Sequence, residues 1–276
     1  MKTIGYIHHD TFIHKVNGAT KLLAFIFLSL VTMITYDTRL LLTIGICSIL
    51  LFPLSKIKWE NISFVVLFIA LFSLLNLIAV YLFAPEYGVE LYQSRTVIWE
   101  GIGRYSLTKE QLFYEFNLVL KYCASIPIAL LFLFTTNPSE FAASLYRIGV
   151  PYKIAYAVAL ALRYIPDIQE EYRTISYAQQ ARGFEISGKN NLWKKIKGTA
   201  LILFPLIFLS LERIDVITNA MLLRRFGKNK KRSWYSEKPF TYRDILVFFF
   251  ILIFISLLII CFYINNGRFY NPFLSS

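Results

Sequence analysis

Five long apolar stretches divide this chain, and polar residues gather between them. The stretches cover residues 22–36, 40–54, 62–83, 116–135 and 245–264. Each approaches the ~20 residues that an α-helix needs to cross a hydrocarbon core of about 30 Å. Because uninterrupted apolar runs of this length are typical of membrane helices, the pattern predicts an all-α membrane protein with about five transmembrane helices.

The segment after the fourth stretch has a different pattern, with a clear helix start. Asn137 is a good N-cap, Pro138 fits the first helical turn, and Glu140 lies near the positive helix end. A short amphipathic helix is predicted to follow and to end before Gly149 and Pro151.

A longer amphipathic helix is predicted next. Residues 152–163 are apolar but too few to span a membrane, and Pro166 is expected to kink the helix or restart it. The helix then runs over residues 167–182 with one apolar stripe, and Gly183 is its natural terminator.

A second long helix is predicted after a linker at residues 188–191. Residues 192–198 are basic, and a helical pattern runs from Thr199 to Arg224, apolar at first and amphipathic later. The basic cluster of residues 228–232 ends it, in solvent or at a lipid surface.

The distribution of charge predicts the orientation in the membrane. Between Thr136 and Arg243 there are 18 Lys and Arg against 8 Asp and Glu, whereas residues 86–115 have a small excess of acidic residues. Because Lys and Arg mark the cytoplasmic side, we expect a cytoplasmic amino terminus. The predicted parts are a membrane part at 1–135 with an external loop at 85–115, a cytoplasmic module of amphipathic helices at 136–232, and a final span with a short external tail at 233–276.

The net charge of +12 raises the question of nucleic-acid binding. The basic residues adjoin membrane segments, where they meet anionic lipid headgroups, so we expect membrane lipid as a partner and no nucleic acid. The low share of charged residues, 17%, also fits a membrane protein, since soluble domains average about 25%. Cys47, Cys123 and Cys261 are far apart in apolar runs and are expected to be small hydrophobic residues.

Residues near the amino terminus are the candidates for a metal or catalytic site. His8, His9 and His14 lie near Asp10, but their spacing is not a helical i, i+4 pair and no second shell is apparent. A solvated or interfacial segment is the favoured interpretation. We therefore predict no metal, no cofactor and no catalytic residue.

A partial phosphate-binding motif occurs at Gly183, Gly188 and Lys189. The phosphate-binding loop needs a preceding strand and a Ser or Thr after the lysine, but here a helix precedes and Asn190 follows. We therefore expect that this chain does not hydrolyse ATP itself.

Two predicted helix ends carry arginine in a similar setting, namely Ala181-Arg182-Gly183 and Leu223-Arg224-Arg225. The ordinary explanation is that cations favour helix carboxyl ends by ~0.3–1 kcal/mol and that glycine caps them. On spacing alone this explanation would be preferred. A functional role gains weight because both helices are predicted to be cytoplasmic, and because a guanidinium binds a partner carboxylate through two planar hydrogen bonds.

At these residues the sequence resembles the T component, the energy-coupling membrane subunit, of energy-coupling factor transporters for vitamins and metal ions, a group that includes the cobalt-transport membrane subunit. The Ala-Arg-Gly signature is intact at residues 181–183, whereas the second signature keeps Arg224 but is flanked by Leu223 and Arg225. The resemblance extends over most of the chain, through Phe12-Ile13-His14-Lys15, Thr20-Lys21-Leu22-Leu23, Thr135-Thr136-Asn137-Pro138-Ser139-Glu140, Gly149-Val150-Pro151-Tyr152 and Ala161-Leu162-Arg163-Tyr164-Ile165-Pro166.

The resemblance implies a non-catalytic subunit of an ATP-driven importer in the bacterial plasma membrane. Its two coupling helices would dock on two ABC-type ATPase subunits through Arg182 and Arg224, and the same chain would hold a substrate-binding S component. ATP binding by the ATPases would move the helices, and the S component would release a vitamin or metal ion inside.

Two other classes of function stay open at the level of sequence. A transporter that needs no ATPase would show internal repeats and charges in the middle of the membrane. No repeat is visible, and Lys121 is the charge that the fourth stretch contains. A membrane enzyme would depend on His8, His9 or His14.

Overall fold

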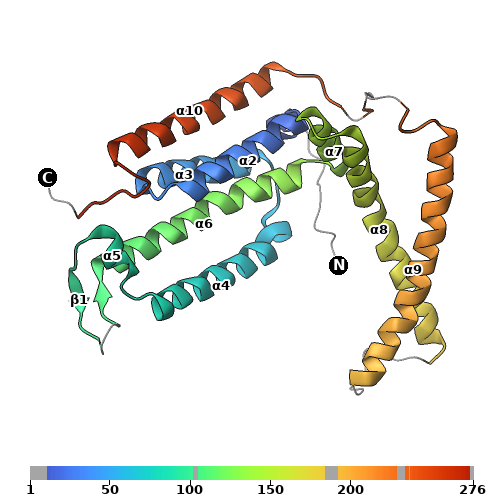
Figure 1. Cartoon of the computed structure of the whole chain (residues 1–276), viewed down its shortest axis with the longest axis horizontal. Helices are drawn as coiled ribbons and strands as arrows, with labels where there is room; N and C mark the ends of the chain where they lie inside the picture. The colour runs from blue at the N-terminus through green and yellow to red at the C-terminus, as the bar shows by residue number, and fades with distance from the viewer. Residues whose placement is uncertain (1–10, 102–104, 184–191, 229–233, 236, 274–276) are drawn as a thin grey trace. The chain divides into compact units, whose positions relative to one another are not determined.

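The computed structural model describes residues 11–101, 105–183, 192–228, 234–235 and 237–273. Two compact units emerge (Figure 1). The first, here called the membrane unit, comprises Met1–Asn137 and Lys238–Ser276. The second, here called the crossed-helix unit, is Pro138–Glu237. Each unit has its own packing.

Helices dominate the membrane unit. They are α1 (Phe12–Lys15), α2 (Gly18–Ile34), α3 (Thr38–Leu54), α4 (Trp59–Phe83), α5 (Tyr87–Tyr92), α6 (Lys109–Thr135) and α10 (Tyr242–Ile264). Segments long and apolar enough to cross a membrane lie in α4, α6 and α10, and α2 and α3 are apolar helices of 17 residues each. The prediction of an all-α membrane protein is confirmed.

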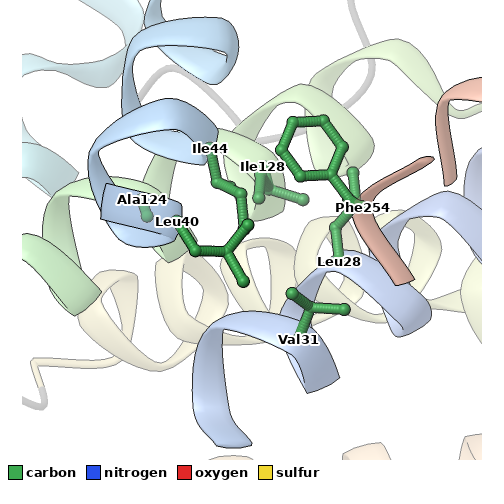
Figure 2. Close-up of a cluster of buried hydrophobic side chains, with 7 residues drawn as sticks. All are labelled: Leu28, Val31, Leu40, Ile44, Ala124, Ile128 and Phe254. Atoms are coloured by element: carbon green, nitrogen blue, oxygen red, sulfur yellow. The ribbon is translucent and has the colours of Figure 1, made fainter. Parts of the chain in front are cut away.

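The core of the membrane unit lies among α2, α3, α6 and α10. Its buried apolar residues face one another from these four helices (Figure 2), and they are Leu28, Val31, Leu40, Ile44, Ala124, Ile128 and Phe254. Helix α4 differs, because most of its apolar side chains are exposed or half-buried, and Ile62 at its start is the apolar residue of its described part that is buried, against Leu130 and Phe134 of α6. A helix that is apolar all round is suited to lipid or to another membrane protein, and not to water.

Caps define the ends of these helices. The Asn17 side chain accepts a hydrogen bond from the Ala19 N–H and begins α2. Thr241 and Asp244 form a capping box that begins α10. The Asp244 carboxylate also accepts a hydrogen bond of 2.9 Å from the Asn17 N–H, so one buried carboxylate joins the starts of two helices.

The predicted external loop at 85–115 is shorter and more ordered than the sequence indicates. It contains α5 and a two-stranded antiparallel pair, β1 (Val97–Trp99) and β2 (Leu107–Thr108). Helix α6 begins at Lys109, before the predicted residue 116, because Thr108 caps it by accepting from the Gln111 N–H. The Glu110 side chain is buried and accepts hydrogen bonds from Ser94 and Thr96, which offsets the cost of its burial.

The tail after α10 is not a free polar end in the described residues. Asn271 donates to the backbone oxygen of Tyr92, and the Tyr92 ring packs edge-on against Phe113 and Phe273 at centroid distances of 5.6 and 5.7 Å. Burial raises the pKa of Tyr92 to about 12, so its hydroxyl stays protonated in the physiological range. The tail therefore fastens α5 to α6.

Candidate functional site

The two arginine-bearing helix ends belong to the crossed-helix unit, which contains α7 (Pro138–Arg147), α8 (Tyr152–Ala181) and α9 (Leu192–Leu223). Helices α8 and α9 cross in contact (Figure 1). The prediction that Pro166 kinks or restarts the helix is wrong as to the restart, because α8 continues through Pro166 as one helix of 30 residues. Proline costs one backbone hydrogen bond there, and the long flanking turns outweigh this loss.

An aromatic contact places the carboxyl end of α9 beside the amino end of α8. The Phe226 ring lies 4.6 Å from the Tyr156 ring and 5.6 Å from the Tyr152 ring, measured between centroids. The Trp234 ring extends the contact, at 6.3 Å from Tyr156 and 6.2 Å from Tyr146. The two long helices are therefore antiparallel.

The two arginine ends consequently lie at opposite ends of the helix pair. Residue 182 follows Tyr156 by 26 residues along α8, which is about 40 Å at a rise of 1.5 Å per residue. Arg224 lies two residues before Phe226, at the end that contacts Tyr156. The arrangement separates the two arginines by most of the length of α8.

The crossing itself has an ionic contact. The Arg213 guanidinium of α9 donates to the Glu171 carboxylate of α8, and it lies 5.6 Å from the centre of the Tyr164 ring. Both ionic side chains are partly exposed, so solvent screens this pair and its contribution to stability is modest. Its geometric role is to fix where the helices meet.

At the first end, Arg182 is the C-cap residue of α8. Its N–H donates to the oxygens of Ala178 and Gln179, and the Gly183 N–H donates to the Gln180 oxygen at 2.9 Å. Gly183 has φ of 82°, in the left-handed region that glycine adopts without a steric penalty.

The second end has the same construction with a different residue at the left-handed position. The Arg224 N–H donates to the Ala220 oxygen, as Arg182 does to Ala178. The next residue, Arg225, has φ of 54°, and its N–H donates to the Leu222 oxygen. A further bond from the Phe226 N–H to the Met221 oxygen completes a Schellman motif.

Arg182 and Arg224 are therefore structurally equivalent. Each follows the last helical residue, and each precedes a residue with left-handed backbone. The two sequences differ at the first and third positions, yet Gly183 and Arg225 at the third position both have positive φ. The ordinary role of a cation at a helix carboxyl end is satisfied by both arginines.

The surroundings of these arginines go beyond that ordinary role. Within the described part of the chain, the structure gives the side chains of Arg182 and Arg224 no hydrogen bond or ion pair, whereas Arg147 pairs with Glu237 and Arg213 with Glu171. Exposed apolar side chains accompany both ends, with Tyr177 exposed by 67% and Leu223 by 86%. A partly apolar surface with an exposed arginine at its centre is typical of a protein-binding site.

Sequence reasoning missed the contacts that shape this unit. The Phe226–Tyr156 and Arg213–Glu171 contacts join residues that are 70 and 42 positions apart. Helical spacing gives no signal for such pairs, because it reports only which residues share a face of one helix.

No metal site emerges among the described residues. No group of three or more His, Cys, Asp or Glu residues there is placed to hold a metal ion. His14 is buried, and its ring contacts the Thr11 hydroxyl at 2.7 Å. His8, His9, Asp10, Gly188 and Lys189 lie outside the described residues.

Comparison with known proteins connects this architecture to a transporter family. The profile of the CbiQ family, described as cobalt transport protein, matches residues 9–235. An energy-coupling factor transporter transmembrane protein EcfT of Bacillus selenitireducens is 30% identical over 265 residues, covering 90% of this chain and 92% of the relative. The protein of the same name from Streptococcus thermophilus is 28% identical over 269 residues, covering 95% and 97%.

A relative of another kind is much longer than this chain. It is a putative ABC transporter ATP-binding protein of Bifidobacterium longum, 25% identical over 262 residues that cover 90% of this chain and 31% of that protein. The family match spans both arginine ends and all the apolar helices before α10. The chain therefore belongs to the CbiQ family of cobalt transport proteins, together with the energy-coupling factor transmembrane proteins that it resembles.

Proposed function

We propose that this chain is the energy-coupling subunit of an ATP-driven importer, which transmits motion from two ABC-type ATPase subunits to a substrate-binding S component for uptake of a vitamin or metal ion. The chain itself carries no catalytic residue in this proposal, and the partner subunits hydrolyse ATP. Ala181, Arg182 and Gly183 form one ATPase contact, and Leu223, Arg224 and Arg225 form the other. The amino terminus and the crossed-helix unit lie in the cytoplasm.

One observation carries the proposal: two exposed arginines occupy equivalent C-cap positions at opposite ends of one antiparallel helix pair. Two equivalent sites on one rigid element suit two copies, or two relatives, of the same partner. A guanidinium at each site binds a carboxylate of the partner through two hydrogen bonds, and the exposed apolar residues beside it exclude water.

The helix pair also suits the transmission of force. The Arg213–Glu171 pair fixes the crossing, and the aromatic contact around Phe226 fixes one end. When two ATPases approach each other on binding ATP, each pulls one end of the pair, and a fixed crossing converts the pull into rotation of α8 against α9. The relative from Bifidobacterium longum supports the partner class, since a segment similar to this chain is part of a protein named for ATP binding.

The test is capture of the ATPases by the membrane subunit. The full chain is co-expressed with ABC-type ATPases and an S component from the same genome, purified through a tag on the chain, and reconstituted for ATP-driven uptake. The variants are Arg182→Ala, Arg224→Ala and both together. Arg173→Ala is the matched control, because Arg173 is an exposed arginine of α8 away from its end.

Each single variant is expected to weaken ATPase capture, and the double variant is expected to abolish capture and uptake. Loss of a desolvated, doubly hydrogen-bonded arginine at an interface costs roughly 2–4 kcal/mol, or about 30- to 1,000-fold in affinity. The Arg173→Ala control should behave as the wild type. If the double variant keeps both assembly and ATP-driven uptake, the proposed contacts are wrong, and uptake without ATP would indicate a different class of transporter.

A further inference from the structure

The membrane unit contains an apolar cavity that the proposed function does not use. Its volume is about 290 Å³, and it lies among α2, α3, α6 and α10. Leu28, Ile44, Ile128 and Phe254, four members of the buried cluster in Figure 2, form part of its wall. Helix α10 packs mainly on α2 and only lightly on α3, which leaves room between these helices.

The position of the cavity along the helices matches one leaflet of a bilayer. On α10 its lining runs from Leu246 to Phe254, which is about 12 Å at 1.5 Å per residue. On α6 it runs from Ile128 to Thr135, at the carboxyl end of the helix. One leaflet of the hydrocarbon core is about 15 Å thick, so the cavity extends from one membrane surface toward the midplane.

Cations mark the mouth of the cavity. Lys21 lines it, and its ammonium donates to the backbone oxygens of Thr135 at 2.9 Å and His14 at 3.4 Å. The Lys238 ammonium donates to the same His14 oxygen at 3.1 Å, and the Arg243 guanidinium lies 5.6 Å from the ring of Phe12, another lining residue. The Asp244 carboxylate nearby is engaged by the backbone N–H groups of Asn17 and Thr241.

We infer that this cavity binds an anionic phospholipid, with an acyl chain between α3 and α10 and the phosphate beside Lys238 and Arg243. An apolar cavity of about half this volume is enough to bind benzene, so the space is ample for part of an acyl chain. Leaving such a volume empty would be costly for stability, which favours an occupant. A soluble ligand is disfavoured because the lining belongs to helices that lie in the membrane, whereas the cations at the mouth complement a phosphate.

The test uses phosphatidylglycerol and phosphatidylcholine that carry the same photoactivatable acyl chain. The full chain is reconstituted in vesicles with either probe, irradiated and digested, and the labelled peptides are identified by mass. Labelling is expected on residues 246–254 of α10 and 44–51 of α3, and to be stronger with phosphatidylglycerol. Lys238→Gln and Arg243→Gln are each expected to reduce that preference roughly fivefold, in line with the usual effect of one cation near a lipid surface.

A cavity-filling variant separates this site from ordinary surrounding lipid. Val247→Trp places an indole in the cavity from a partly exposed position and should remove most of the labelling of α3. Leu252→Trp on the exposed face of the same helix and Lys58→Gln at an exposed basic position are the matched controls, and they should leave the labelling unchanged. A melting temperature close to the wild type shows that each variant is folded.

Three results would overturn the inference. The first is equal labelling of the cavity peptides by both lipids, which would mean that the cations do not select the headgroup. The second is labelling that Val247→Trp does not reduce, as expected for lipid around the outer surface. The third is no labelling of the cavity peptides, which would mean that protein covers this space. None of these measurements depends on ATPase docking, so the inference and the proposed function fail separately.

Discussion

Arg225→Gly distinguishes the two neighbouring arginines at the end of α9. The proposed function places an ATPase contact at Arg224, whereas Arg225 occupies the left-handed position with φ of 54°. For a residue other than glycine this backbone costs roughly 1–2 kcal/mol. Glycine removes that cost. It also makes the unfolded chain more flexible, which destabilises the folded protein by about 0.4–1 kcal/mol. The expected net change is therefore a stabilisation of about 0.5–1 kcal/mol.

The variant should raise the melting temperature of the purified protein by roughly 1–4 °C. It should weaken ATPase capture less than Arg224→Ala does, because the backbone hydrogen bonds from residue 225 to Leu222 and from Phe226 to Met221 keep the helix end in place and only the Arg225 side chain is lost. Arg225→Pro is the opposite control: it removes the N–H that bonds Leu222 and cannot adopt a positive φ, so a cost of about 3 kcal/mol is expected.

Two outcomes would contradict these expectations. If Arg225→Gly abolishes ATPase capture while Arg224→Ala keeps it, the partner contact belongs to Arg225, and the equivalence of Arg182 with Arg224 has no functional meaning. If Arg225→Gly lowers the melting temperature, the left-handed backbone at residue 225 does not destabilise the protein.

Three further changes test the contacts that organise the two units. A double-mutant cycle of Arg213→Met and Glu171→Gln should give a coupling free energy of about 0.5–1 kcal/mol, because the ion pair is partly exposed. A coupling free energy near zero would contradict the role of this pair at the helix crossing. Phe226→Ala should destabilise the protein by roughly 2 kcal/mol and Phe226→Leu by less, since the Phe226 ring is partly buried against two tyrosines. Equal losses of stability in the two variants would argue against a packing role for the ring. Asp244→Asn should cost about 2–3 kcal/mol in a thermal melt, whereas the exposed Asp215→Asn should be neutral. The buried carboxylate accepts from the Asn17 N–H with one oxygen and from the Thr241 N–H with the other, and the amide replaces one of these acceptors with an NH2 donor.

The sequence was sufficient for the class of fold because the membrane imposes a strong pattern. An apolar stretch such as 62–83 has to be a helix in lipid, so helix α4 follows from composition alone. The start of α6 shows where this reasoning stops. The first turn of α6 contains Glu110, a charged residue that the sequence pattern places in a loop. Its carboxylate accepts a hydrogen bond from the Thr96 N–H, fourteen residues earlier in the chain. A pattern within one segment does not report a partner in another segment.

The candidate site divides in the same way. The C-cap position of Arg182 is readable from the sequence, because Gly183 after an amphipathic run predicts the left-handed residue that ends the helix. At Arg224 no glycine occupies the next position, and the equivalence appears only from the backbone angle of Arg225. The contact of Phe226 with Tyr156, which shows that the two arginines lie at opposite ends of the pair, joins distant parts of the chain and has no local signal.

The chain passes between its two units at two points, after Asn137 and after Glu237, and both points lie next to the cations at the mouth of the cavity. Lys21 bonds the Thr135 oxygen two residues before the first point, and Lys238 follows the second point and bonds the His14 oxygen. The Asn17 amide donates to the Lys238 oxygen, and the Asn17 backbone N–H donates to the Asp244 carboxylate. One polar cluster thus anchors both connections on the membrane side. Under the proposed coupling function, the two covalent connections from the crossed-helix unit enter the membrane unit at this cluster, which is where the inferred lipid phosphate would bind.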